Sequence, residues 1–214
     1  MKKTSFFVAL VLTLSLLLCP LASADVITAL ATEINPEHLE KVACYARILG
    51  YNEETNSLTV ELIVPERFSG EEVGALKEGD SICTNGQEIL IESISYDDEW
   101  CSTLFINGWD VFLIQDRDGN YTAMADEDNC VWIPLAVIEC PVRDSMLFLD
   151  NVDEETGNAL TLPVVHSARE LTARLLEEGT DEAYTVGLSA NNVYVVFDGE
   201  GNLATIQRFY VPWQ

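Results

Sequence analysis

The stretch that decides the fold is residues 43–79, ACYARILGYNEETNSLTVELIVPERFSGEEVGALKEG. Apolar and polar residues alternate over 44–49 and again over 58–64, with the period of two that half-buried strands show. The residues between them, 52–56, are polar turn formers. This pattern predicts a β-hairpin.

A short helix is expected directly after the hairpin. Ser69 and Glu72 have the spacing of a capping box, in which each side chain satisfies a free amide of the first helical turn. Val73 and Leu76 provide one buried stripe. Gly79 can adopt the left-handed conformation that ends a helix.

The same plan recurs about a hundred residues later, which favours an internal duplication. The second copy comprises a strand at 147–149, a turn at 153–158, a strand at 160–165, a capping box of Ser167 and Glu170, and a helix at 168–178 ended by Gly179. A strand at 111–114 with a turn at 118–120 likewise matches 193–196 with 200–202. We expect two structurally related subdomains, the first with an insertion at 87–107. A chance likeness between two hairpin–helix units is the alternative.

Between these copies the chain has the pattern of a meander. Strands are expected at 81–84, 88–95, 101–106, 109–115 and 130–138, with two-residue hairpin turns at Asn85-Gly86 and Asn107-Gly108. The predicted fold class is therefore α+β and β-rich, with antiparallel sheets and two short helices. A continuous β-barrel or sandwich with a smaller α+β appendage is the second possibility.

The N-terminal residues have the features of a secretory signal peptide. Lys2 and Lys3 precede an apolar run at 6–18, which is too short for a comfortable membrane span. Ala22-Ser23-Ala24 offers small residues for cleavage before Asp25. We expect residues 1–24 to be removed and the protein to be secreted, either extracellular or in the cell envelope.

The rest of the chain is strongly acidic. The full sequence has a net charge of −25, and loss of Lys2 and Lys3 leaves 9 basic against 36 acidic groups, a net charge of −27. Such a surface repels nucleic acid and anionic membranes, so we expect neither as a partner and no membrane insertion after cleavage. The charge favours a cationic protein or cell-surface ligand, or divalent ions, or it serves solubility alone.

The expected organisation is a lead-in segment at 25–40, a β-rich N-terminal subdomain at 41–141 and an α+β C-terminal subdomain at 142–214. The boundary is predicted at Cys140-Pro141.

Five cysteines follow the leader: Cys44, Cys83, Cys101, Cys130 and Cys140. Export favours disulfides, and the odd number leaves one thiol without an intramolecular partner. No Cys-x-x-Cys pair is present, which disfavours a zinc knuckle. Cys130 and Cys140 would pair only if Pro134 reversed the chain, and Cys44 fits a buried free thiol equally well.

No catalytic constellation is visible. His38 and His166 are the two histidines, and we interpret the first as an exposed turn residue and the second as a structural residue before the helix. His166 and the adjacent Ser167 would point to opposite faces of a strand, so they form no dyad. The abundant carboxylates leave an acid–base pair open.

A candidate ligand site is Asp97-Asp98-Glu99-Trp100, the densest acidic cluster beside an aromatic ring. Asp97, Asp98 and Trp100 are the residues suited to a sugar or a cation there. An ordinary solvated turn, with Trp100 folded onto the core, explains the same residues. Trp132 is expected in the core, and the position of Trp109 is left open.

The sharpest metal candidate is Asp116-x-Asp118-x-Asn120 with Glu127 at the twelfth position, the ligand spacing of a calcium loop. Tyr121 stands where such a loop needs glycine, and its flanks have strand patterns, so a plain hairpin turn competes with calcium binding. No other cofactor is indicated.

These observations favour an exported, acidic, non-enzymatic binding or interaction module. One alternative is a calcium-stabilised binding domain that uses residues 116–127. The other is a carbohydrate-binding or hydrolytic protein centred on residues 97–100.

Overall fold

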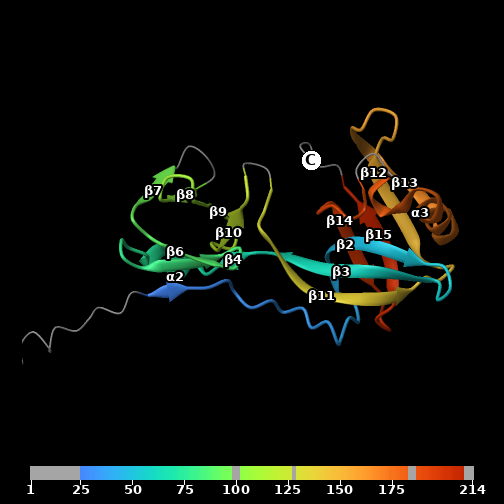
Figure 1. The fold of residues 1–214 in the computed structure, drawn as a ribbon, viewed down its shortest axis with the longest axis horizontal. Helices are drawn as coiled ribbons and strands as arrows, with labels where there is room; N and C mark the ends of the chain where they lie inside the picture. The colour runs from blue at the N-terminus through green and yellow to red at the C-terminus, as the bar shows by residue number, and fades with distance from the viewer. Residues whose placement is uncertain (1–24, 98–101, 127–128, 183–186, 210–214) are drawn as a thin grey trace, which may run out of the picture.

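The structure, a computed structural model, describes residues 25–97, 102–126, 129–182 and 187–209. The predicted fold class is confirmed, because the chain is β-rich with mostly antiparallel pairing. Two helices, α2 (Gly70–Ala75) and α3 (Ala168–Glu182), lie within the described residues. Figure 1 shows the strands gathered into two lobes side by side along the long axis.

The large lobe contains a seven-stranded sheet in the order β11-β3-β2-β14-β15-β12-β13. Its strands are β2 (Ala43–Asn52), β3 (Ser57–Pro65), β11 (Trp132–Pro141), β12 (Leu147–Val152), β13 (Ala159–Ser167), β14 (Val193–Phe197) and β15 (Leu203–Arg208). All neighbours pair antiparallel except β12 and β15, which run parallel. Leu171 and Leu175 of α3 complete a core with sheet residues such as Ile48, Val60 and Val195.

The small lobe contains two sheets and α2. The three-stranded sheet comprises β1 (Val26–Ile27), β5 (Ser81–Thr84) and β6 (Gln87–Leu90). The five-stranded sheet comprises β4 (Arg67–Phe68), β10 (Tyr121–Met124), β9 (Val111–Gln115), β8 (Thr103–Ile106) and β7 (Ile94–Asp97), in that order. Phe68, Val73, Ile82, Leu104 and Leu113 belong to its separate core.

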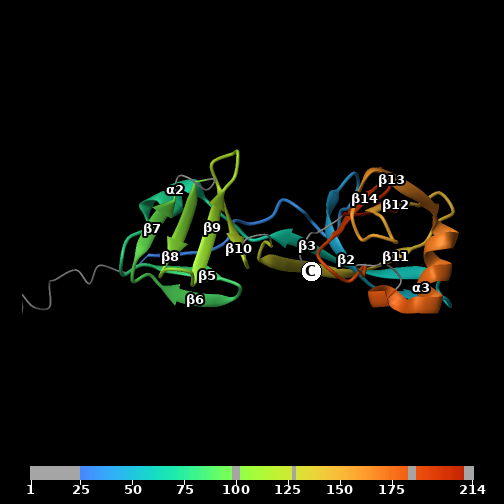
Figure 2. The same ribbon diagram turned by 90° about the horizontal axis from the view of Figure 1, so that it is seen from above.

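In the sequence, most of the small lobe is inserted between β3 and β11, two strands that pair with each other in the large lobe. Pro65 at the end of β3 lies opposite Trp132 at the start of β11. The chain therefore leaves the large lobe after Pro65 and re-enters it beside the same residue, at Trp132. Figure 2 shows this crossing point between the lobes. The predicted boundary at Cys140-Pro141 falls at the end of β11, so strands from both of its sides share one sheet.

The two predicted copies are also distributed differently from the expectation. Hairpins β2–β3 and β12–β13 lie in one sheet of the large lobe. Hairpins β9–β10 and β14–β15, the second matched pair, lie in different lobes. The lead-in contributes to both cores, through Ile27 in the small lobe and Leu39 in the large lobe.

Local turn chemistry accounts for most strand ends. Asn85-Gly86 forms the predicted two-residue hairpin, with φ of 50° and 70° and Thr84 opposite Gln87. The prediction for Asn107-Gly108 was wrong in length, because Ile106 pairs with Val111 across four residues.

The predicted strand at 88–95 is interrupted, and its halves are β6 and β7. The side chain of Asn107 accepts hydrogen bonds from the amides of Glu92 and Ser93 at 2.7 and 3.1 Å, which takes this segment out of the ladder. Buried Ile91 anchors the break in the core of the small lobe.

One capping box is confirmed and the other is wrong. Ser167 and Glu170 exchange bonds, with the Ser167 amide 2.7 Å from Oε2 of Glu170 and the Glu170 amide 3.3 Å from Oγ of Ser167. Ser69 makes no side-chain capping bond to α2. Gly179, predicted to end α3, has φ of 76° and breaks the helix, which resumes to Glu182.

The described cysteines are free thiols: Cys44, Cys83, Cys130 and Cys140. Burial raises the pKa of Cys44 to about 11, and burial with the nearby Glu139 charge raises the pKa of Cys140 to about 11. Cys101 lies outside the described residues. Pro134 produces a register shift in β11 and no reversal, so the strand runs extended from 132 to 141.

Among the described residues, no helix combines the length and the apolar character that a membrane crossing requires.

Candidate functional site

A pocket of about 320 Å³ lies beside β12 and β13 in the large lobe. Its apolar wall is formed by Val152, Leu160 and Val164, and its polar lining is formed by Asp150, Asp153, Glu154, Glu155 and His166. This volume lies near the lower end of the range for small-molecule sites. It therefore suits a small ligand or one large side chain.

Asp150, which lines the pocket, forms a buried ion pair with Arg208. Asp150 and Arg208 are 1% and 0% exposed. Arg208 Nε donates to Oδ1 at 2.8 Å and Nη2 donates to Oδ2 at 2.7 Å, a bidentate arrangement. The amide of Val152 adds a third bond to Oδ1 at 3.0 Å. Both carboxylate oxygens of Asp150 are thus bonded to protein donors, and the bonds from Arg208 link β12 to β15.

The rim of the pocket is the acidic turn between β12 and β13. Asp153 accepts hydrogen bonds from the amides of Glu155 and Thr156 at 2.9 and 3.0 Å. The bond from Thr156 is the main reason that the pKa of Asp153 is lowered. The rim is therefore negatively charged at neutral pH.

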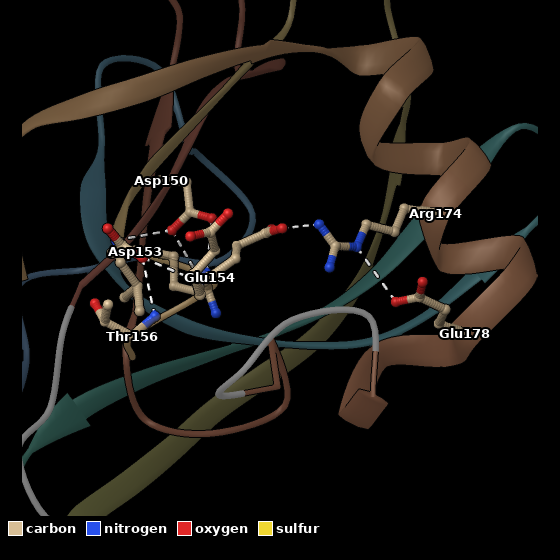
Figure 3. A network of polar contacts seen from close by, with 9 residues as sticks. Asp150, Asp153, Glu154, Thr156, Arg174 and Glu178 are labelled. Carbon is tan, nitrogen blue, oxygen red and sulfur yellow. Dashed lines mark hydrogen bonds and ion pairs between the residues drawn. The ribbon is translucent and has the colours of Figure 1, made fainter. Parts of the chain in front are cut away.

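The helix α3 restrains one side of this rim. Figure 3 shows Arg174 reaching from α3 to the turn, between Glu154 and Glu178. Arg174 thus neutralises Glu154. The side chain of Glu155 is exposed and forms no ion pair within the described residues, so its charge faces solvent beside Asp153.

His166 lines the same pocket and is half-buried. Its ring stacks on Phe148 with centroids 5.6 Å apart. His166 was predicted to be a structural residue before the helix, and the pocket was not predicted. The available signal was the acidic turn 153–155 followed by a strand that is apolar on both faces.

That strand, β13, is the last strand of the sheet. Within the described residues no strand pairs with its outer side. Leu162, Val164 and Val165 on it are 78%, 49% and 59% exposed. An open edge with exposed apolar side chains is a template for pairing with another extended chain.

The calcium candidate folds as a tight hairpin turn. Oδ1 of Asp116 accepts the amides of Asp118 and Asn120 at 2.9 and 3.0 Å, and Oδ2 faces the guanidinium of Arg67. Burial opposes the ionisation of Asp116, but the Arg67 bond and these amides outweigh it and lower the pKa. Asp116 is thus already satisfied by protein donors.

The other predicted calcium ligands, Asp118 and Asn120, form fewer contacts with protein donors than Asp116 does. Asp118 is exposed at the turn and lies 3.9 Å from Arg67. The side chain of Asn120 accepts the amide of Gly70 at 3.4 Å. Glu127 lies outside the described residues. Within the described part of the chain, no group of three His, Cys, Asp or Glu side chains is arranged to hold a metal ion.

Of the candidate ligand residues 97–100, Asp97 ends β7 opposite Thr103. Asp98 and Trp100 lie outside the described residues. A different aromatic group lies in the same lobe: the rings of half-buried Phe105 and Phe112 and of Trp109 contact one another at centroid distances of 4.6–5.7 Å. Trp109 is 69% exposed.

The comparisons with known proteins add no relative to this description. No protein-family model, no curated protein and no solved structure matched the chain.

Proposed function

We propose that this protein is an exported, acidic, non-enzymatic binding module that pairs an extended segment of a cationic partner with the edge strand β13. The observation that carries the proposal is the open edge of β13, with three exposed apolar residues beside an acidic pocket. Addition of a strand to a sheet edge provides affinity through main-chain bonds and specificity through alternate side-chain pockets.

The pocket beside β13 suits a basic side chain of the bound partner segment. The apolar wall of Val152, Leu160 and Val164 suits an aliphatic stem, and the rim of Asp153 and Glu155 suits a positive head group. Pro163 offers no N–H and the amide of Ser167 already donates to Glu170, so we confine the added strand to residues 164–166.

Charge also argues against a second copy of this chain as the occupant. Each copy carries a net charge of −25, or −27 after loss of the leader, and would bring a second acidic rim to the same edge. A cationic partner is attracted by the same field, and its association becomes faster at low ionic strength.

The test uses a fluorescent eight-residue peptide of alternating valine and lysine, and its glutamate counterpart, in anisotropy titrations. The lysine peptide is expected to bind and the glutamate peptide is not. Val164→Lys places a positive charge at the pocket and should weaken binding by about tenfold or more.

The matched control is Val137→Lys on β11, the opposite edge strand, where the native side chain is 58% exposed. It should leave the affinity unchanged. Equal binding of both peptides, or equal affinity of V164K and V137K, would rule out the proposed interface. If the protein sediments as a dimer and V164K abolishes that dimer, the occupant of the β13 edge is a second copy of this chain and not a cationic partner.

A second candidate function is carbohydrate binding, now favoured by the exposed ring of Trp109 beside Phe105 and Phe112. Stacking on a sugar face is a common use of such a ring platform. A glycan array should show binding that Trp109→Ala removes and that Leu90→Ala, at an exposed site in the same lobe, does not. An array without hits for the unaltered protein would end this candidate.

A further inference from the structure

The first described residues line a second pocket, in the small lobe. It has a volume of about 270 Å³, and Asp25, Val26, Glu72, Leu76 and Asp80 are among its lining residues. No Lys or Arg is among the residues that line it. The pocket therefore presents carboxylates without a basic side chain between them.

Asp80 is the buried carboxylate of this pocket, with 2% of its surface exposed. Its Oδ2 accepts the amide of Lys77 at 3.1 Å, and its Oδ1 accepts the backbone N of Asp25 at 3.2 Å. Within the described residues no basic side chain forms an ion pair with Asp80. Burial of a carboxylate is costly unless a positive group compensates it.

Strand pairing sets the position of the Asp25 nitrogen. Val26 and Ile27 lie opposite Ser81 and Ile82 in parallel register, and the Ser81 amide donates to the Asp25 carbonyl at 2.8 Å. Ile27 is buried in the core of the small lobe. The nitrogen of residue 25 is therefore held at the carboxylate of Asp80 by the same contacts that dock β1.

We propose that cleavage of the chain between Ala24 and Asp25 creates the cation that this pocket lacks, because the new α-ammonium group of Asp25 pairs with the buried carboxylate of Asp80. Hydrolysis consumes one water, breaks the peptide bond, and leaves a carboxylate on Ala24 and an amine on Asp25 that takes a proton. The site of cleavage is the one expected from Ala22-Ser23-Ala24.

The consequence is a small lobe that is more stable after processing than before it. A neutral amide donor becomes a charged one, and charge-assisted hydrogen bonds are roughly twice as strong. Removal of the leader thereby strengthens the docking of β1 and of Ile27.

The first experiment compares two proteins released from a fusion without extra residues, one beginning at Asp25 and one retaining Ala24. One added residue moves the free amine by about 3.8 Å along the chain. The protein that begins at Asp25 should melt higher by about 4 °C or more. In an Asp80→Asn background this difference should vanish, whereas Glu88→Gln, on the exposed part of β6, should preserve it.

Equal melting temperatures of the two proteins would overturn the inference. So would a difference that persists in Asp80→Asn.

A second measurement needs no variant. The chain from Asp25 onward has three amines, the α-amine and the side chains of Lys41 and Lys77, and peptide mapping can assign each of them. A protonated amine in an ion pair is a poor nucleophile, so acylation of the α-amine at neutral pH should be about tenfold slower in the folded than in the denatured protein. Equal rates in the two states would contradict the pairing.

Discussion

The two lobes carry the same three local features, and their different surroundings separate what the local sequence encodes from what tertiary neighbours decide. Each lobe has a hairpin turn that begins with Asp and ends with Gly-Asn, a Ser-x-x-Glu segment at a helix start, and at least one buried carboxylate. The turns are alike in both lobes. The helix starts and the buried carboxylates are not.

The turns show how much a five-residue segment determines by itself. In each, Oδ1 of the first Asp accepts the amides two and four residues later, at 2.9 and 3.0 Å for Asp116 and at 2.8 and 2.9 Å for Asp198. The fourth residue is a glycine with φ of 84° or 76°. All of these bonds lie within the turn, so its conformation survives a change of lobe.

The helix starts differ because of their neighbours. Ser167 precedes a helix with a free first turn, and its capping box forms. At α2, the chain passes so close to the turn of the small lobe that a Cβ on Gly70 would lie 1.9 Å from the carbonyl oxygen of Gly119. Glu72 lines the pocket beside Asp80. Tertiary packing thus overrides a correct local signal.

The buried carboxylates differ in what compensates them. Asp150 in the large lobe has the guanidinium of Arg208. Glu66 in the small lobe has the hydroxyl of Thr84 and the amide of Asn85, at the tip of the β5–β6 hairpin. An ion pair and a set of neutral donors should respond very differently to removal of one partner.

The largest effect is expected from Arg208→Met. It leaves the Asp150 carboxylate buried without its cation and should lower the free energy of unfolding by about 3–5 kcal/mol. Glu66→Gln retains an oxygen acceptor for its donors and should cost about 1–2 kcal/mol. Urea unfolding followed by fluorescence measures both.

The double variant Asp150→Leu with Arg208→Met is the control, since it removes both charges. It should recover much of the loss, because an apolar pair of similar volume leaves no unpaired charge. Equal costs for R208M and the double variant would show that lost packing, and not the unpaired charge, dominates at this position.

The next effect is expected from Gly70→Ala. Its new methyl group meets backbone that cannot rotate away, so we expect a loss of about 1–3 kcal/mol or somewhat more. Gly199→Ala is the matched glycine in the turn of the large lobe, where the nearest atom is a flexible Lys41 carbon at 3.9 Å. It should be neutral in the same unfolding assay. A neutral G70A would mean that α2 and the turn do not pack as closely as described.

The sequence predicted the features whose causes are local. The Asn85-Gly86 hairpin, the Ser167–Glu170 cap and the alternation of β2 and β3 each depend on residues a few positions apart, and each is present. The assignment of strands to lobes was out of reach, because Cys44 pairs with Val195 and Leu147 pairs with Thr205, and whole helices and strands lie between these partners in the sequence.

The pocket was missed for a related reason. Val164 and His166 are two residues apart and lie on the same face of β13. Their partners across the β12–β13 ladder are buried Asp150 and Phe148, respectively, so this face is the one that points to the core. The partial exposure of Val164 and His166 depends on where α3 lies over the sheet, which no local pattern reports. For the calcium candidate, the hairpin turn was predicted as the alternative, but no local pattern indicated that Arg67 would face Asp116.

A smaller effect is expected from Asp116→Asn compared with Asp198→Asn. Asn keeps an acceptor for the turn in both, and both changes remove a carboxylate that the turn amides stabilise, but D116N also removes the direct ion pair with partly exposed Arg67. We therefore expect D116N to lose about 0.5–1 kcal/mol more than D198N.

This loss should depend on pH with a definite sign. The folded pKa of Asp116 is lowered, so its contribution is complete above the ordinary Asp pKa of about 3.9 and is lost as the pH falls through the folded value below it. Thermal melts of D116N and the unaltered protein should therefore differ at pH 7 and converge in strong acid. A difference that grew on acidification would contradict the assignment.

The smallest effect separates the two Ser-x-x-Glu segments. Glu170→Gln weakens a formed capping box, because the amide of Ser167 bonds to the carboxylate of Glu170 and is the main cause of its lowered pKa. A drop in Tm of roughly 2 °C is expected at pH 7. This drop in Tm should disappear as the pH falls through the folded pKa of Glu170, below the ordinary Glu value of about 4.3.

The control is Glu72→Gln, which has the same local sequence context but no cap to lose, so its Tm should not fall for this reason. An equal drop in both variants would mean that the Glu charge near the helix N-terminus, and not the hydrogen-bonded box, is what stabilises these helices.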